Sequence, residues 1–340
     1  MKKAIILFNL GGPDSLDAVE PFLFNLFNDP AIISLPSIFR YPLAKFISKR
    51  RTPIAKAIYA EMGGKSPILE ETQSQANAIE KNLKAEKDEY KCFIVMRCWN
   101  PRASETIKKV INFNPGQIIL LPLYPQYSNA TSGSSINEWL EICKKENIKI
   151  DTKTICCYPT EENFISAYSN LIKEKINLNK LSETTLIFSA HGLPENKIKS
   201  GDPYQWQVEQ SVNELVKKLS IQNLNYILSY QSRVGPLKWI GPSTEKVIKD
   251  EAKKAKIIIV VPVAFVSEHS ETLVELDIEY KKLAEENGSK EYIRVPAVTV
   301  NQDFINSLKS SILRASIGEK FTSSIKCLGK FKKCPRLQNL

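Results

Sequence analysis

The sequence lacks any apolar run approaching the ~18 residues that a membrane-spanning helix needs, which excludes transmembrane helices. Its seven cysteines are an odd number without framework spacing, which excludes a disulfide scaffold and indicates a reducing compartment. With 340 residues, 43% of them hydrophobic and 25% charged, the chain is also neither disordered nor collagen-like. Its length predicts about two domains.

The net charge of +10 is concentrated at the C-terminal end. Residues 320–340 hold six basic residues and no acidic ones, so the rest of the chain is close to balanced. A balanced body argues against nucleic-acid binding. Two interpretations of this tail stay open: a solvated, mobile terminus, or a segment attracted to an anionic membrane surface.

The first residues, MKKAIILFNLGGPD, look like a signal peptide, but their apolar stretch is short and no small-residue cleavage site follows. We interpret this stretch as a first β-strand and expect a cytoplasmic protein.

Short β-branched runs alternate with amphipathic stretches of helical period. Strands are expected at 4–9, 92–96, 118–123, 185–189, 225–229 and 257–263, and helices at 70–87, 101–112, 161–177, 205–220, 243–255 and 270–287. Near-continuous apolar strands separated by helices predict parallel sheets covered on both faces.

The two halves of the sequence resemble each other. IILFNLGGP corresponds to LIFSAHGLP, and IILLPLYPQYS corresponds to IIIVVPVAFVSE, in the same order along the chain. We therefore predict an α/β fold of two Rossmann-like domains related as a pseudo-repeat: 1–155, 156–312, and a basic tail at 313–340. Ligands of such sheets bind beyond the carboxyl ends of the strands, so the predicted site is a cleft lined by the loops that follow them.

The chain has two histidines, and both follow predicted strands. His191 lies in SAHGLP, where an imidazole at a strand tip can bind a metal or accept a proton near pH 7. The alternative is a hydrogen-bonded structural histidine.

Glu271, Glu275 and Glu279 are spaced by four in the predicted helix at 270–287, which would align them in one stripe. No basic residue lies between Lys256 and Lys281 to neutralise them. The stripe is either a solvated acidic face or an oxygen-rich path for a divalent cation or for protons.

Residues 22–51 combine six phenylalanine or tyrosine residues with a basic end, Lys49–Arg51. Proline-punctuated sequence here is compatible with two short helices packed in the core. It is also compatible with an apolar lip that touches a membrane surface.

Several motifs together identify a resemblance. The chain resembles the ferrochelatase family, which inserts Fe²⁺ into porphyrins, over residues 3–310. The similar segments are FNLGGP, RRTP with GGKSPI, MRCWNP, LYPQYSNATSGSS, SAHGLP, YQSRVGP with WIGP, and VPVAFVSEHSETLVELDIEY.

The resemblance implies roles for individual residues. His191 and Glu271 match the metal-binding and catalytic pair, and Glu275 and Glu279 match an acidic relay on the same helix. Arg51, Tyr59 and Ser66 match positions near the porphyrin propionates. Further substrate-binding positions are matched by Arg97, Tyr127, Ser232, Trp239 and Phe265.

The resemblance also sets expectations for substrates and cofactors. Asn129 stands where some relatives have a cluster-binding cysteine, and the tail holds just Cys327 and Cys334, so we predict no iron–sulfur cluster and no resident cofactor. The turn GGPDS favours protoporphyrin IX, with Fe²⁺ as the second substrate. Alternatives are a chelatase for coproporphyrin or another tetrapyrrole, and a non-catalytic two-lobed binder of haem or metal. Peripheral contact with the inner face of a membrane stays open.

Overall fold

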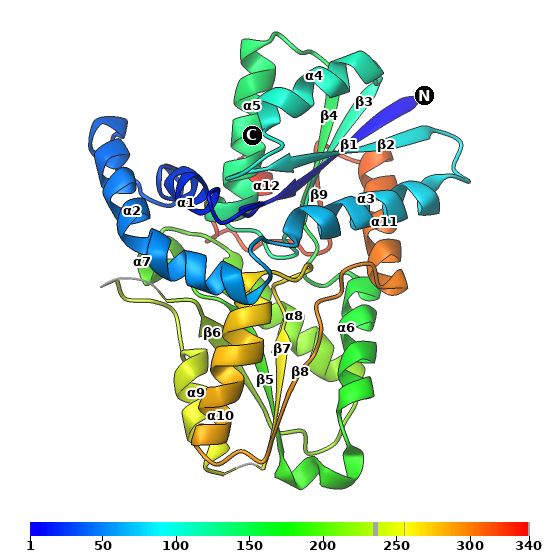
Figure 1. The fold of residues 1–340 in the computed structure, drawn as a ribbon. Coiled ribbons are helices and arrows are strands. Elements are labelled where there is room, and N and C mark those ends of the chain that lie inside the picture. The colour runs from blue at the N-terminus through cyan, green and yellow to red at the C-terminus, as the bar shows by residue number, and fades with distance from the viewer. Residues whose placement is uncertain (234–236, 255, 339–340) are drawn as a thin grey trace. The chain divides into compact units, whose positions relative to one another are not determined.

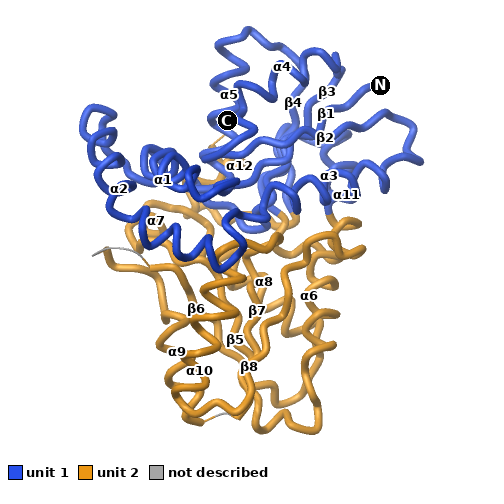
Figure 2. The backbone as a smooth tube through the Cα atoms, viewed as in Figure 1, with its two compact units in different colours: residues 1–157, 308–323, 339–340 blue, residues 158–307, 324–338 orange. Residues whose placement is uncertain are grey.

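The computed structural model describes residues 1–233, 237–254 and 256–338. It divides the chain into two compact units, of which the first holds residues 1–157 and 308–323 and the second 158–307 and 324–338 (Figure 2). Three residues of the YQSRVGP motif, 234–236, and residue 255 of a predicted helix lie outside the described residues.

The first unit is built on a five-stranded sheet in the order β2-β1-β3-β4-β9 (Figure 1). Its strands pair in parallel throughout. The strands are β1 Lys2–Asn9, β2 Glu89–Met96, β3 Gln117–Pro122, β4 Asp151–Cys157 and β9 Phe321–Ser323. The helices are α1 Val19–Phe27, α2 Ser37–Glu61, α3 Ile68–Leu83, α4 Ala103–Phe113, the π-helix η1 Asn129–Gly133 and α5 Ser134–Lys145.

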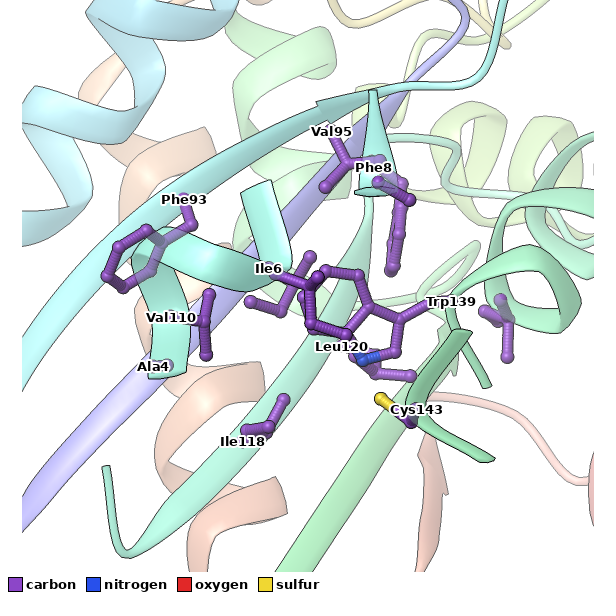
Figure 3. Close-up of a cluster of buried hydrophobic side chains, with 13 residues drawn as sticks. Ala4, Ile6, Phe8, Phe93, Val95, Val110, Ile118, Leu120, Trp139 and Cys143 are labelled. Carbon is purple, nitrogen blue, oxygen red and sulfur yellow. The ribbon is translucent and has the colours of Figure 1, made fainter. Parts of the chain in front are cut away.

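Alternation along the strands builds the core of this unit. Ala4, Ile6 and Phe8 of β1 point to one face of the sheet, where they meet α4 and α5 (Figure 3). Trp139 of α5 is fully buried there, with its ring edge-on to Phe8 at a centroid distance of 6.1 Å. Because β1 and β3 are buried on both faces, they appear in the sequence as nearly continuous apolar runs.

The second unit is built on a four-stranded parallel sheet in the order β6-β5-β7-β8. Its strands are β5 Thr184–His191, β6 Tyr226–Gln231, β7 Ile257–Pro262 and β8 Glu291–Arg294. Its helices are α6 Glu162–Lys175, η2 Leu178–Glu183, α7 Glu195–Lys199, α8 Tyr204–Leu219, α9 Thr244–Ala252, the π-helix η3 Glu271–Glu279, α10 Tyr280–Glu286 and α12 Pro335–Gln338. Helix α11 Gln302–Ile317 contains the boundary between the two units.

Strand order confirms the predicted pseudo-repeat. The series β2-β1-β3-β4 in the first unit recurs as β6-β5-β7-β8 in the second. In each unit the third strand of this series, β3 or β7, is followed in the sequence by a π-helix, η1 or η3. All six predicted strands and all six predicted helices are present, within a few residues at each end. The prediction missed β4, β8, β9, α5 and α11, together with the short helical segments η1, η2, α7 and α12.

For residues 22–51, the structure differs from one of the two interpretations, that of two short helices packed in the core. Residues 37–61 form one helix, α2, that contains Pro42 and Pro53. Its exposed apolar side chains include Phe39, Phe46 and Ile54, each more than 60% accessible. None of the described helices combines the length and the hydrophobicity needed to cross a bilayer.

The basic tail is partly integrated into the fold. Phe321 begins strand β9, which pairs with β4 in the first unit. In the second unit, Cys327, Phe331 and Cys334 are buried and pack against Trp206 of α8, with the Phe331 and Trp206 rings 5.1 Å apart. The structure therefore differs from the interpretation of a fully solvated terminus.

Replacing Phe331 with alanine should lower the free energy of unfolding by about 3 kcal/mol, because it leaves a cavity beside Trp206. Leu328→Ala is the matched control, since Leu328 is 49% exposed and its loss should cost under about 0.5 kcal/mol. Urea unfolding followed by circular dichroism measures both. Equal effects of the two substitutions would contradict the packing of the tail on α8.

Candidate active site at the carboxyl ends of strands β5, β6 and β7

His191 ends strand β5, and the backbone around it is tightly fixed. The hydroxyl of Tyr204 donates to the carbonyl oxygen of His191 at 3.0 Å. The next residue, Gly192, donates its N–H to the carbonyl of Gln231 at 2.8 Å. A Cβ on Gly192 would lie 2.9 Å from that same oxygen and 3.3 Å from the Trp239 ring, so only glycine fits this turn. The imidazole is thus held at the strand tip, as the sequence predicted.

The His191 ring contacts the first carboxylate of helix η3. Its Nδ1 lies 2.8 Å from Oε2 of Glu271. The hydroxyl of Ser232, just beyond β6, lies 2.9 Å from that same oxygen and 2.6 Å from Oε2 of Glu275. Residues from three neighbouring strand ends therefore meet in one hydrogen-bonded group within the second unit.

Glu275 is held by three further donors. Its carboxylate accepts from the side-chain amide of Gln231 at 3.0 Å and from the backbone N–H of Ser232 at 3.0 Å. The hydroxyl of Tyr280, five residues along the helix, donates to Oε1 at 2.8 Å. Gln231 also donates to the carbonyl oxygen of Glu271 at 3.1 Å, so one amide connects both glutamates.

Two features of the backbone could not be inferred from residue spacing. The segment 271–279 is a π-helix, a rare form that recurs at functional sites, whereas the spacing of four had indicated an α-helix. Ser232 has φ +61°, a left-handed conformation that a non-glycine residue adopts at a cost of ~1 kcal/mol. This conformation lets its N–H and its hydroxyl both reach Glu275.

The charges of the group stabilise one another. Burial lowers the pKa of His191, but the charge and hydrogen bond of Glu271 and the charge of Glu275 outweigh burial and raise it above the usual 6.5. Burial raises the pKa of Glu271, yet the charge and hydrogen bond of His191 dominate and bring it to about 2. Burial and the Glu271 charge raise the pKa of Glu275. Each charge of the His191–Glu271 pair thus favours the charged form of its partner, and Glu275 is the more readily protonated of the two carboxyls.

Three other predicted site residues belong to the second unit: Trp239, Phe265 and Glu279. Trp239 pairs its backbone with Pro194 and packs on Gly192. The Phe265 ring contacts His269, with centroids 4.8 Å apart. Glu279 is exposed at the end of η3, outside the hydrogen-bonded group, so the predicted stripe of three carboxylates is two grouped carboxylates and one solvated one.

Arg97, in the first unit, is engaged by carboxylates of its own chain. Its guanidinium lies 3.1 Å from Asp29 and 3.1 Å from Glu138, and its Nε donates to Ser134 at 2.7 Å. Asp29 is buried between α1 and α2, so Arg97 anchors the loop that joins these helices. Geometry gives Arg97 a structural role, and substrate contact stays a prediction.

The remaining predicted positions also lie in the first unit. Tyr59 is buried in the cluster that contains Phe22, and Tyr127 is 2% exposed beside Gly133. Ser66 is buried against Gly12, where an added Cβ would come within 2.5 Å of its side chain. Arg51 lies over the Phe27 ring at 5.9 Å. The contacts given above for these four residues lie within the first unit, and their role at the porphyrin stays a prediction.

Sequence reasoning missed Gln231, Tyr280 and Tyr204. Gln231 and Tyr280 belong to quoted motifs, YQSRVGP and DIEY, but nothing in the letters says that they donate to the same carboxylate. Tyr204 begins helix α8, and its contact with His191 depends on where that helix packs.

Comparison with known proteins decides the family. A family model described as ferrochelatase matches residues 2–316. A ferrochelatase of Pelagibacter ubique is 62% identical, with 99% of each chain covered. Another, of Rickettsia bellii, is 51% identical over 97% of this chain and 94% of its own. The chain belongs to the ferrochelatase family.

Solved structures support the architecture expected of this family. SirB from Bacillus subtilis with Fe³⁺ aligns with a TM-score of 0.52 at 13% identity, covering 93% of this chain and 96% of its own. The cobalt complex of the sirohydrochlorin chelatase SirB from subspecies spizizenii also has a TM-score of 0.52 at 13% identity, covering 93% and 95%. At this identity the likeness concerns the fold alone, and it confirms the chelatase-like pair of parallel sheets.

The pH dependence of the His191–Glu271 pair is testable. A double-mutant cycle with His191→Asn and Glu271→Gln should give a coupling energy of about 1 kcal/mol, since both side chains are partly exposed. Because the pKa of His191 is raised in the folded protein, its contribution to stability is fully present below pH 6.5 and is lost as the pH rises through the folded pKa. Because the pKa of Glu271 is lowered, its contribution is fully present above pH 4.5 and is lost as the pH falls toward 2. Coupling should therefore be greatest between about pH 4.5 and 6.5. Urea unfolding across that range measures it, and coupling that grows above pH 8 would contradict the pair.

Proposed function

We propose that this enzyme inserts Fe²⁺ into protoporphyrin IX and that His191 and Glu271 are its reacting groups. Family membership establishes the coarser activity: the chain is a ferrochelatase-family enzyme, and its function is insertion of Fe²⁺ into a porphyrin in haem biosynthesis. The observation that carries the residue assignment is the 2.8 Å contact between His191 Nδ1 and Glu271 Oε2, supported by Ser232 and Glu275.

Metal insertion must remove two pyrrole N–H protons while one Fe²⁺ binds the four ring nitrogens. Nδ1 of His191 is engaged by Glu271, which leaves Nε2 as the atom that can accept a pyrrole proton when the ring is neutral. Glu271 shares Ser232 with Glu275, whose pKa is raised, so a proton can pass from the first carboxyl to the second. Glu279, exposed at the end of η3, is the proposed outer member of this path.

Borderline divalent metals bind imidazole and carboxylate ligands without thiolates. Glu271 is already stabilised by His191 and Ser232, so an arriving Fe²⁺ competes with existing partners for the same oxygen. Such a site binds the ion weakly enough to release it to the porphyrin. Fe²⁺ is thus a substrate here.

Substitution of the two reacting groups should abolish turnover while porphyrin binding persists. We expect Glu271→Gln and His191→Ala each to lower kcat by at least about 10²-fold, the usual contribution of a positioned acid or base. Glu286→Gln is the control, because Glu286 is exposed on α10 and pairs with Lys282 at 3.9 Å. Loss of free-porphyrin fluorescence under anaerobic conditions measures insertion.

The same assay discriminates between the alternatives. Faster turnover of protoporphyrin IX than of coproporphyrin III supports the proposed substrate, and the reverse order rejects it. Tight porphyrin binding without turnover of either, with Fe²⁺ or Co²⁺, would instead support a binding protein. Full activity of both site variants would reject the roles given to His191 and Glu271.

We further propose that the enzyme carries no iron–sulfur cluster. Cys327 and Cys334 are both buried against Phe331, and Asn129 begins the π-helix η1. Cluster absorbance in anaerobically purified protein would overturn this proposal.

Peripheral membrane contact is proposed on the outer face of α2. Phe39, Leu43, Phe46 and Ile54 recur at intervals of four, three and eight, so they lie on one side of the helix, and all are exposed. Lys49 and Arg50 lie in the same helix. Anionic head groups would meet these cations while the apolar side chains enter the interface. The tail adds further exposed cations, Lys326, Lys330 and Lys332.

Phe39→Asp with Phe46→Asp should reduce co-sedimentation with phosphatidylglycerol vesicles at low salt by about tenfold or more, because burial of the two rings is lost. Ile111→Asp with Leu178→Asp is the matched control, since both side chains are exposed elsewhere. Charge reversal of Lys326, Lys330 and Lys332 separates the contribution of the tail. Unchanged binding by the α2 variant would reject α2 as the contact surface.

A further inference from the structure

We propose that Arg294 is a positioning residue for iron insertion: by binding Glu268 and Asp277 together, it fixes π-helix η3 so that Glu271 faces His191. This inference rests on the function proposed for Glu271. Arg294 itself touches neither His191 nor Glu271 among the contacts of the described residues, so its effect is exerted through the helix.

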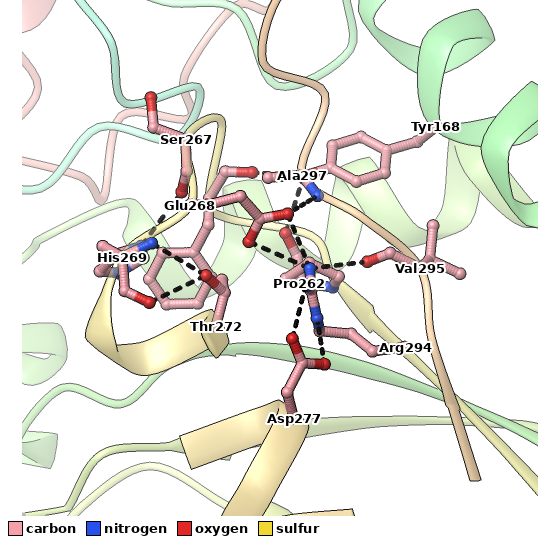
Figure 4. Close-up of polar contacts among 11 residues, drawn as sticks. Tyr168, Pro262, Ser267, Glu268, His269, Thr272, Asp277, Arg294, Val295 and Ala297 are labelled. Atoms are coloured by element: carbon pink, nitrogen blue, oxygen red, sulfur yellow. Dashed lines mark hydrogen bonds and ion pairs between the residues drawn. The ribbon is translucent and has the colours of Figure 1, made fainter. Parts of the chain in front are cut away.

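The guanidinium of Arg294 makes two charge-assisted contacts of high quality (Figure 4). Its Nε and Nη2 donate to the two oxygens of Asp277 at 2.6 and 2.7 Å, a bidentate pair. Its Nη1 lies 2.8 and 3.0 Å from the two oxygens of Glu268. Arg294 is 11% and Glu268 14% exposed, so water screens this pair little.

The two carboxylates lie on either side of Glu271 in the sequence. Glu268 belongs to the loop after β7, just before the helix, and Asp277 is within the helix. One rigid, planar group therefore fixes both the entry to η3 and its second half. The backbone N–H of Ala297 also donates to Glu268 at 2.9 Å, which fixes the orientation of that carboxylate.

Strand β8 provides a rigid base for these contacts. Arg294 pairs with Val260 of β7 in the sheet. Tyr292, two residues earlier and hence on the same face, donates its hydroxyl to the carbonyl of Leu276 at 2.8 Å. Two side chains on one face of β8 thus bind neighbouring positions of the same helix, one at its backbone and one at a carboxylate.

The loop that enters η3 is attached at further points. Tyr168 donates to the carbonyl oxygens of Pro262 and Phe265, and Thr272 accepts from the N–H of His269 at 2.9 Å (Figure 4). These contacts fix the loop but reach no residue beyond Thr272. Arg294 connects the loop to the far half of the helix by binding both Glu268 and Asp277. Because π-helices are marginal in isolation, we attribute the persistence of this one to such external attachment.

Nuclear magnetic resonance can test positioning without measuring activity. The chain has just two histidines, so ¹⁵N-histidine labelling gives two ring systems, and His269→Gln assigns them. In the native protein His191 should show a hydrogen-bonded Nδ1. Arg294→Met should shift this signal toward that of a free imidazole, and Arg294→Lys should shift it less, since lysine keeps the charge but not the bidentate geometry. Tyr292→Phe should have a smaller effect of the same kind.

Kinetics provide the second readout. Arg294→Met should lower kcat for iron insertion by about 10²-fold, as expected of a displacement near 1 Å, with KM for porphyrin nearly unchanged. Lys309→Met is the control: it removes a partly exposed ion pair, to Glu86 at 2.7 Å, in the first unit, and should leave kcat unchanged. Arg294→Lys should fall between Arg294→Met and the native enzyme.

Removal of Arg294 leaves two carboxylates without their cation, so the single variant could unfold. The triple variant Arg294→Met, Glu268→Gln, Asp277→Asn removes all three charges and should stay folded by circular dichroism. If it folds yet keeps the native His191 signal and native kcat, Arg294 does not position the site. If Arg294→Met shifts the His191 signal while Glu271→Gln retains full turnover, positioning holds and the role proposed for Glu271 fails.

Discussion

Two carboxylates in neighbouring turns of one helix repel each other, and much of the second unit is arranged to hold them together. Glu271 is stabilised by the imidazole of His191, and Glu275 by four donor groups, so that the pair stays close. The donors come from the ends of β5 and β6 and from the helix itself. Parallel strands make this possible, because their carboxyl ends meet at one edge of the sheet. Because the two glutamates have different partners, the pKa of Glu271 is lowered and the pKa of Glu275 is raised.

A comparison of the two units shows that strand order alone does not create the site. The first unit has the same strand order and also places a π-helix after its corresponding strand. There the helix η1 has the sequence NATSG, with hydroxyls and no carboxylate, and the residue after strand β2 is Arg97 instead of a serine. Arg97 is neutralised by Asp29 and Glu138, which ties together the loops of that unit. One framework thus supports the proposed reacting group in the second unit and an ion-pair network in the first.

The sequence predicted the strands and helices that carry strong apolar periodicity, and it predicted His191 and Glu271 from motif and placement. It did not predict that η3 is a π-helix, because the spacing of four in its sequence is also that of an α-helix, and the two differ in their backbone hydrogen bonds. Contacts such as Gln231 with Glu275 and Arg294 with Asp277 connect residues that are far apart in the sequence, so no local pattern contains them. The sequence also could not predict that Phe39 and Phe46 are exposed, since an apolar helix face can pack in the core or lie on the surface.

The contacts between helix η3 and the strands of its unit have a consequence for how His191 and Glu271 behave. Strand β8 holds the helix by Arg294 and Tyr292, whereas the strand ends of β5 and β6 hold its glutamates by His191 and Ser232. The helix is therefore fixed on the side away from the imidazole as well as toward it. If, as proposed, Fe²⁺ or a proton replaces one partner of Glu271, the contacts of Arg294 and Tyr292 still fix the helix. A carboxylate can then exchange partners without the backbone moving, which is what a group that receives an ion and releases it again must do.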